Sequence, residues 1–239
     1  MITFSLLGKY GRLGNQFFQI SAVIGIALAN HQPYMFPPWQ YEDLMINRFP
    51  LDYNLMSPYV IINEVWPYVG IPAIKVGHFD LQGYFQSYKY FNHVTNIKDT
   101  FRFNVETNDD TDRVAIHVRR GDYLGHQNIH PIPPFEYYRR AMNLFPNENF
   151  SIFSDDIDWC KDTFINYNNV VYILPGDPLT DLLYMSKHKA VITANSSFSW
   201  WGGYLCNGPV VCPKVWALNE PIECMGDRIP PDWNIIQYD

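Results

Sequence analysis

The sequence has few charged residues and no long apolar run. Charged residues make up 17% of its 239 residues, against about 25% in average proteins. The formal net charge is −7 and no basic stripe interrupts this acidic balance, so we expect no nucleic-acid partner. No apolar run approaches the roughly 20 residues that cross a bilayer, so we expect no transmembrane segment. Hydrophobic residues reach 47%, which indicates a globular protein with a well-filled core.

Cysteine is also scarce. The four cysteines are Cys160, Cys206, Cys212 and Cys224. None forms a C-x-x-C pair, and no histidine lies beside them at zinc-ligand spacing. We therefore expect reduced thiols in or near a core, as in cytosolic proteins.

The N-terminal stretch MITFSLLGKYGRLGNQ lacks a basic region before its short apolar run. This favours a first strand over a signal peptide, and we expect a cytoplasmic protein or one peripheral to a membrane. The glycosylation sequons at Asn149 and Asn195 are then interpreted as chance matches.

The first part of the chain predicts the opening unit of an α/β fold. Residues 2–8 predict a strand, residues 11–16 a glycine turn, and residues 15–30 a helix that is apolar almost all round. Residues 32–68 show little periodicity. The aromatic residues 83–91 predict a partly helical segment.

The polar, acidic residues 100–112 favour a boundary between domains 1–110 and 111–239. Beyond it, short strands alternate with helices, which predicts parallel β-α units that bind ligands at the carboxyl ends of the strands. The expected strands are 113–118, 149–154, 170–174, 189–195 and 208–213, and the expected helices are 133–145, 155–166, 178–188 and 196–206.

The stretch VAIHVRRGDYLG, residues 114–125, places two arginines directly after a buried strand. Because side chains alternate along a strand, His117 and Arg119 point to the same face at its carboxyl end. A guanidinium there can bind phosphate oxygens with two donors at once. Alternatively, Asp122 or another carboxylate pairs with an arginine for structural reasons. The RGD tripeptide also matches a cell-adhesion signal, which we consider a false positive.

Two further stretches offer backbone N–H groups to an anion. GRLGNQ, residues 11–16, is a glycine turn that feeds a helix, although it lacks both G-K-[ST] and G-x-G-x-x-G. Its Asn15 either contacts a ligand or caps the helix. ANSSFSWWGG, residues 194–203, places serines where a helix follows a strand. We expect these serines to be shared between cap and ligand, and the tryptophans to be core.

The acidic stretch FSDDIDW, residues 153–159, contains the D-x-D pattern Asp156–Asp158, which holds a divalent metal in some sugar transferases. A structural interpretation is better, in which Ser154 caps a helix and the acids complement the helix dipole. A carboxylate from Asp155 or Asp156 facing a cleft could accept both N–H groups of a guanine edge.

Taken together, GRLGNQ, IHVRRGDY, FSDDIDWC and LMSKHKAVITANSSFSWWGGYL resemble the inverting α-1,2-fucosyltransferases, glycosyltransferase family eleven. GYFQSYKYF is also similar to the middle segment of that family. The H-x-R-R motif is shared with α-1,6- and protein O-fucosyltransferases. The resemblance is strongest from about residue 114 to residue 216.

The resemblance implies an α/β, GT-B-like fold of two Rossmann-type halves facing a cleft, with a reduced N-terminal, acceptor-side half. It implies fucosyl transfer from GDP-β-L-fucose, without metal or other cofactor, to a hydroxyl of a glycan acceptor, for which we expect O2 of a galactoside. The donor is held mainly by the C-terminal half. The acceptor and the linkage stay open, since the missing length falls in the acceptor-side half.

The resemblance also assigns residues. Arg119, with Arg120 beside it, matches the arginine that contacts the donor pyrophosphate, and stabilising the charge on departing GDP is expected to be the largest catalytic term. Asp122 is our candidate for the base, although it could equally be the partner of an arginine. The remaining donor-binding positions are His117 and Asp155 or Asp156 near guanosine, Ser196, Ser197 and Ser199 in the phosphate turn, and Gly14 and Asn15 in the N-terminal loop.

Three alternatives remain. One is a sugar-nucleotide or glycan-binding protein without turnover, and another is a fucosyltransferase of different linkage. The third is a metal-dependent transferase that uses Asp156 and Asp158.

Overall fold

The chain divides into two compact units. The computed structural model describes all residues except 53–58, 109–110, 219, 221–223 and 239. Unit 1 comprises Met1–Val105 and Gly226–Pro230, and unit 2 comprises Glu106–Met225 and Pro231–Asp239. The boundary expected between residues 110 and 111 adjoins residues 109–110, which lie outside the described residues.

Unit 1 is built on a small parallel sheet of three strands in the order β1-β3-β2. Its strands are β1 (Ile2–Thr3), β2 (Val60–Asn63) and β3 (Phe79–Gln82). The strand predicted over residues 2–8 ends at Thr3, because the chain turns there. Isolated parallel bridges, Ile2 with Tyr34 and Phe36 with Leu51, continue the pairing beyond β1.

The predicted first helix is confirmed as α1 (Leu13–Ala29). It is buried along most of its length, as a helix that is apolar nearly all round must be. The other helical elements that include residues of unit 1 are short: η1 (Glu42–Leu44), η2 (Tyr88–Tyr90), η3 (Ile97–Phe101) and α6 (Met225–Arg228).

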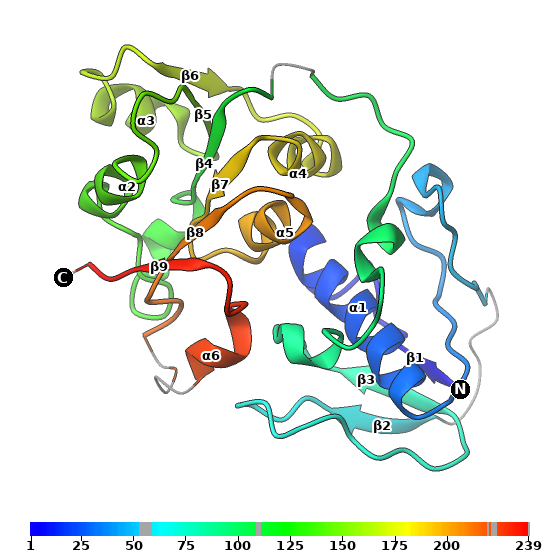
Figure 1. Cartoon of the computed structure of the whole chain (residues 1–239). Coiled ribbons are helices and arrows are strands. Elements are labelled where there is room, and N and C mark those ends of the chain that lie inside the picture. The colour runs from blue at the N-terminus through cyan, green and yellow to red at the C-terminus, as the bar shows by residue number, and fades with distance from the viewer. Residues whose placement is uncertain (53–58, 109–110, 219, 221–223, 239) are drawn as a thin grey trace. The chain divides into compact units, whose positions relative to one another are not determined.

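Unit 2 contains a parallel sheet of six strands in the order β6-β5-β4-β7-β8-β9 (Figure 1). The strands are β4 (Val114–Val118), β5 (Phe150–Ser154), β6 (Val170–Ile173), β7 (Ala190–Ile192), β8 (Val210–Pro213) and β9 (Asn234–Ile236). The first five were expected from the sequence. The helical elements are η4 (Asp122–Gly125), α2 (Phe135–Met142), α3 (Ile157–Thr163), α4 (Pro178–Ser186) and α5 (Ser197–Leu205).

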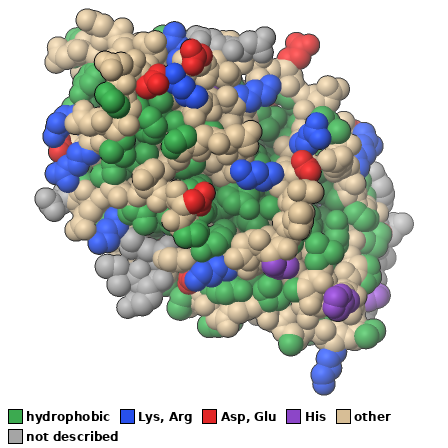
Figure 2. All heavy atoms as spheres, in the orientation of Figure 1, with side chains coloured by type: hydrophobic (Ala, Val, Ile, Leu, Met, Phe, Trp, Pro, Cys, Tyr) green, Lys and Arg blue, Asp and Glu red, His purple; other side chains and the backbone are tan. Residues whose placement is uncertain are grey.

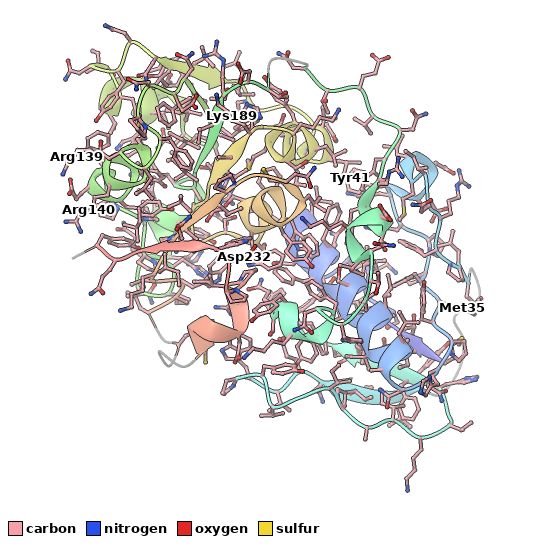
Figure 3. All side chains as sticks on the ribbon, viewed as in Figure 1. Met35, Tyr41, Arg139, Arg140, Lys189 and Asp232 are labelled. Carbon is pink, nitrogen blue, oxygen red and sulfur yellow. The ribbon has the colours of Figure 1, made fainter. Side chains whose placement is uncertain are left out.

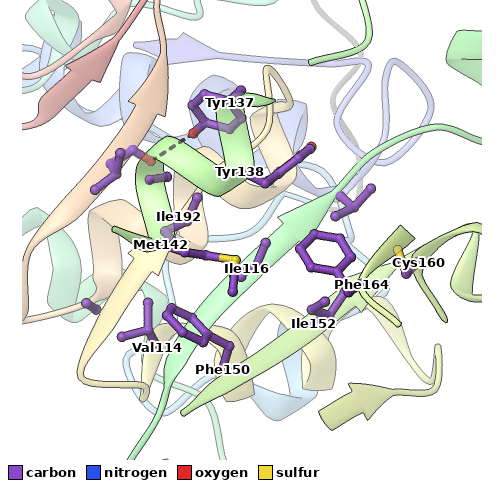
Figure 4. Packing of buried hydrophobic residues seen from close by; sticks show 14 residues of the cluster. Val114, Ile116, Tyr137, Tyr138, Met142, Phe150, Ile152, Cys160, Phe164 and Ile192 are labelled. Atoms are coloured by element: carbon purple, nitrogen blue, oxygen red, sulfur yellow. Dashed lines mark hydrogen bonds between the residues drawn. The ribbon is translucent and has the colours of Figure 1, made fainter. Parts of the chain in front are cut away.

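The two faces of this sheet carry different cores. Along β4, Val114, Ile116 and Val118 pack with residues of α2 and α3 (Figure 4). The intervening Ala115 packs on the opposite face with residues of α4. Because both faces are covered, all five residues of β4 are buried, as is usual for a parallel strand.

The strand order fixes where a ligand can approach. From β4, the chain adds β5 and β6 on one side and then β7, β8 and β9 on the other. The order therefore reverses between β4 and β7, and open α/β sheets bind ligands outside the carboxyl ends of their strands at such a reversal.

The four cysteines are buried, as expected. Among the described residues, no helix is both long and apolar enough to span a bilayer.

Candidate active site

The double arginine lies where β4 ends, beside the reversal of strand order. β4 ends at Val118, so Arg119 and Arg120 are the next two residues. Their side chains diverge. The Arg120 guanidinium lies 4.1 Å from the ring centre of Trp159 on α3, whereas the Arg119 guanidinium lies 5.5 Å from that of Tyr123.

Arg119 is held by two carboxylates. Its Nη2 contacts Oδ1 of Asp122 at 2.5 Å, and its Nη1 contacts Oδ2 of Asp155 at 2.7 Å. The Arg119 side chain is 17% exposed, while those of Asp122 and Asp155 are 40% and 27% exposed. The pairing with Asp122 is the structural alternative that the sequence left open. It answers how the cation is kept near apolar packing, since burial is tolerable for a charge that is paired.

Arg120 belongs to a second ion pair. Its Nε donates to Oδ2 of Asp156 at 3.0 Å, and its backbone N–H donates to Oδ1 of Asp155 at 2.9 Å. The Asp155 carboxylate therefore bonds to both arginines, to the side chain of Arg119 and to the backbone N–H of Arg120. The end of β4 and the end of β5 are joined by this carboxylate.

Gly121 makes room for that carboxylate. A Cβ at this position would lie 2.4 Å from Oδ2 of Asp155. The close approach of Asp155 therefore requires a residue without a side chain at position 121.

The D-x-D pattern separates into two unrelated roles. Asp156, and not Ser154 as expected, is the N-cap of α3, and its Oδ1 accepts the Trp159 N–H at 3.2 Å. Ser154 lies two residues too early and instead accepts the Asp156 N–H at 2.9 Å. Asp158 is 95% exposed and pairs with Lys161. Within the described part of the chain, no three His, Cys, Asp or Glu residues are grouped as metal ligands would be.

His117 is the buried titratable residue of the stretch VAIHVRRGDYLG. It is 5% exposed, and its Nδ1 has no hydrogen-bond partner among the described residues. Burial, together with the nearby charge of Arg119, lowers the pKa of His117 to about 3. The imidazole is therefore neutral at physiological pH. Its ring lies 5.3 Å from that of Phe198, which connects the end of β4 to the first turn of α5.

The serine-rich turn lies between β7 and α5. Ser196 is the N-cap of α5 but makes no side-chain cap bond. Ser197 is half-buried, and Ser199 is fully buried, with its hydroxyl bonded to the backbone of Ala194. The first N–H groups of α5 have no partner within the helix and can bind an anion. The hydrogen bonds of the buried Ser199 hydroxyl to the Ala194 backbone stabilise this turn.

Two residues that the sequence did not single out connect these parts. Asn195 is fully buried and donates its amide to the carbonyls of Pro131 and Trp216. Tyr123 donates its hydroxyl to the Asn195 carbonyl at 3.1 Å. The only available signal for Tyr123 was its place beside Asp122. For Asn195, the sequence suggested only a chance sequon.

Gly14 and Asn15 lie in unit 1, in the first turn of α1. Arg12 is the N-cap of α1, and no side chain caps the helix, so Asn15 does not play the capping role. Its Oδ1 accepts a hydrogen bond from Nε2 of Gln86 at 2.7 Å.

Another arginine doublet in unit 2 provides a contrast. Arg139 and Arg140 on α2 both pair with Glu136, and their side chains are 47% and 44% exposed. Figure 3 shows both on the outer side of α2. In the face shown in Figure 2, Lys and Arg side chains are scattered among neutral and hydrophobic ones.

Comparison with known proteins supports the interpretation of these motifs. The family model for glycosyl transferase family 11 matches residues 68–237. An α-1,2-colitosyltransferase of Escherichia coli is 32% identical over 181 residues, 66% of this chain and 62% of the relative. The galactoside α-(1,2)-fucosyltransferase 1 of Bos taurus is 22% identical over 84% of this chain and 66% of its own length. The matched regions thus span less than two thirds of either relative.

Among solved structures, the fucosyltransferase NodZ from Bradyrhizobium has a TM-score of 0.54 at 11% identity, covering 86% of this chain and 93% of that chain. This likeness, with a parallel sheet in each unit, confirms the α/β, GT-B-like fold class that the sequence predicts. The family match covers most of the chain and includes the double arginine, Asp155 and Asp156, and the serine-rich turn. The chain belongs to glycosyl transferase family 11.

Proposed function

We propose that the chain transfers L-fucose from GDP-β-L-fucose to a hydroxyl of a galactoside, at O2, with inversion and without a metal. Two relatives carry α-1,2-transferase names, one for colitose and one for fucose on a galactoside. A structural neighbour, the α-1,6-fucosyltransferase NodZ, was solved after soaking with GDP-fucose. The observation that carries the proposal is the position of Arg119 at the end of β4, beside the reversal of strand order.

The chemistry explains why a guanidinium belongs there. The acceptor oxygen attacks the anomeric carbon from the face opposite to GDP, the bond to the phosphate oxygen breaks, and its electron pair leaves with GDP. Negative charge therefore builds on the diphosphate as the sugar becomes oxocarbenium-like. A fixed cation next to that oxygen stabilises the transition state, which is commonly the largest single catalytic term.

The side chains of the site carry a net negative charge, because two arginines face three aspartates. Donor binding therefore requires that a phosphate replace at least one carboxylate. Asp122 is the most exposed of the three, and its 3-10 turn η4 follows Gly121. In this proposal the diphosphate takes the place of Asp122 on Arg119. Asp122, once released, is the base that accepts the proton of the acceptor hydroxyl.

The other residues bind the donor. Asp155 fixes the guanidinium of Arg119 and the backbone of Arg120, so the phosphate-binding groups are in place before the donor arrives. The N-terminus of α5, with Ser196 and Ser197, adds N–H and hydroxyl donors, and Ser199 supports the turn. The remaining assignments follow the family resemblance: His117 and Asp155 or Asp156 near guanosine, and Gly14 and Asn15 from unit 1.

Thermal unfolding with GDP tests the proposal. With EDTA present, GDP at about one hundred times its Kd should raise the melting temperature by about 5–10 °C. Arg119→Ala should abolish the shift, and the matched Arg139→Ala should retain it. An absent shift in the unmodified chain, or an unchanged shift in Arg119→Ala, would contradict the proposal.

Turnover separates a transferase from a binding protein. GDP should be released from GDP-fucose only when a galactoside is present, and the rate should survive EDTA. Mass spectrometry with linkage analysis of the product then tests the α-1,2 bond. GDP binding without acceptor-dependent release would instead favour the non-catalytic alternative, and loss of activity in EDTA would favour the metal-dependent one.

A further inference from the structure

Three loops of unit 1 converge at the carboxyl edge of its sheet. Tyr10 lies between β1 and α1, Glu64 directly follows β2, and Tyr84 is two residues beyond β3. The rings of Tyr10 and Tyr84 are stacked, with centroids 4.8 Å apart and planes 18° apart. Oε2 of Glu64 accepts the Tyr84 N–H at 2.7 Å. Tyr84 thus contacts both of the other residues, Tyr10 through its ring and Glu64 through its backbone N–H.

A buried side chain of α1 stabilises the loops that carry this cluster. Gln19 on α1 is fully buried, and its amide donates to the Tyr10 carbonyl at 3.0 Å and to the Gly83 carbonyl at 3.4 Å. One side chain therefore links the Tyr10 loop to the Tyr84 loop. Their relative placement is fixed before any ligand binds, which lowers the entropic cost of binding.

Two residues at this edge have a positive φ, one of them a glycine. Gly83 has φ +147°, and a Cβ there would lie 2.4 Å from Cβ of Glu64. Phe85 has φ 52°, which is unusual for a residue other than glycine. Strained conformations that survive in a packed structure cluster at functional sites. Here they place Tyr84 and Glu64 against each other.

The exposed surface of the cluster has the chemistry of a sugar site. The side chains of Tyr10 and Tyr84 are 37% and 41% exposed, although both are large aromatics. A sugar ring offers an apolar C–H face that packs on such rings and an edge of hydroxyls that donate to a carboxylate. The carboxylate of Glu64 accepts backbone N–H groups from residues 84–86, which leaves about one of its roughly four acceptor sites for a hydroxyl donor.

We propose that Tyr10, Tyr84 and Glu64 form a galactoside-binding subsite of unit 1, in which the sugar packs on the tyrosine rings and donates hydroxyl hydrogen bonds to Glu64. That this sugar is the acceptor rests on the proposed function. Of the three, only Tyr84 belongs to one of the sequence motifs, GYFQSYKYF, and nothing in that motif assigned it a ligand. Burial raises the pKa of Glu64, as expected for a carboxylate kept partly dry at a binding surface.

Direct binding of lactose tests the subsite without the donor. Saturation-transfer NMR should detect lactose on the full chain. Tyr84→Ala should weaken binding by about tenfold or more, since it removes the exposed ring. The matched Tyr84→Phe keeps the ring and should bind within a few-fold of the unmodified chain. Val76→Ala, at a side chain that is 93% exposed elsewhere in unit 1, should have no effect.

Two further variants keep the test decisive if Tyr84→Ala unfolds. Tyr10→Ala and Glu64→Gln should also weaken lactose binding, each with a cooperative melting curve. Lactose binding that is absent in the unmodified chain, or unaffected by these substitutions in folded variants, would overturn the subsite. Tyr84-dependent lactose binding in a chain that neither responds to GDP nor transfers fucose would overturn the proposed function and leave the subsite standing.

Discussion

The two sheets of this protein end in different chemistry. The carboxyl edge in unit 2 consists of paired charges, with Arg119 and Arg120 held by three aspartates. The carboxyl edge in unit 1 consists of stacked tyrosines and Glu64. The same architecture thus presents a charged site suited to a diphosphate and an aromatic site suited to a neutral sugar.

The two edges also differ in how the sequence encodes them. In unit 2, the arginines are adjacent in the chain, as are Asp155 and Asp156, so short runs reveal the site. In unit 1, each loop contributes a single residue, and the three are separated by 20 residues or more. A site built from one residue per loop is not visible as a single motif, and only the fold brings its members together.

The largest effect we expect is the loss of turnover in Arg119→Ala. Removing a group that stabilises charge on the leaving group should lower kcat by about 10²–10³-fold. Lactose binding, measured by NMR, should not change, because Arg119 lies outside the tyrosine subsite. Tyr84→Ala should do the opposite, raising the acceptor KM while retaining the response to GDP. If both variants impaired the same parameter, the division of labour between the two edges would be wrong.

A smaller effect is expected from Gly121→Ala. The new Cβ would lie 2.4 Å from Oδ2 of Asp155, the carboxylate that holds both arginines. We expect GDP binding to weaken by about tenfold and stability to fall by about 1–3 kcal/mol, the usual cost of overpacking. Isothermal titration with GDP and thermal unfolding measure the two effects.

The matched control for this substitution is in the same turn. A Cβ on Gly125 would meet nothing within 4 Å, so Gly125→Ala should leave GDP affinity unchanged. An equal loss of GDP affinity in both variants would show that the flexibility of the turn, rather than the position of the Asp155 carboxylate, governs binding.

Most of unit 2 was predictable because its strands and helices leave strong local signals, although β9 was not expected. Buried parallel strands such as Val114–Val118 are continuous apolar runs, and the intervening helices follow a proline, an aspartate or a serine. The errors there were local. The sequence assigned the N-cap of α3 to Ser154, whereas the N-cap is Asp156. Serine and aspartate are both good N-cap residues, and these two are only two positions apart.

Unit 1 was predicted less well, for two physical reasons. Its strands β2 and β3 have four residues each, β3 alternates apolar and polar residues, and the short apolar run of β2 is mostly exposed, so neither has the signal of a buried strand. Its middle region is fixed by turns and aromatic packing that have no period. Only α1 has enough buried length to be recognised from the sequence. The roles of the individual site residues in both units stay predictions until they are tested.

The smallest effect we expect concerns the charge of Glu64. Burial raises its pKa above the ordinary 4.5, so the folded state binds a proton more readily than the unfolded state. The contribution of Glu64 to stability is therefore greatest below pH 4.5 and is lost as the pH rises through its folded pKa. Because glutamine does not titrate, the melting temperature of Glu64→Gln relative to the unmodified chain should rise between pH 4 and pH 7.

Melting curves of the unmodified chain and of Glu64→Gln from pH 4 to pH 8 measure this gain. A carboxylate that costs stability at neutral pH and whose removal also weakens lactose binding is retained for the ligand. If Glu64→Gln gained nothing with pH and bound lactose normally, Glu64 would only fasten the Tyr84 loop, and the aromatic edge would have to bind its sugar through the tyrosines alone.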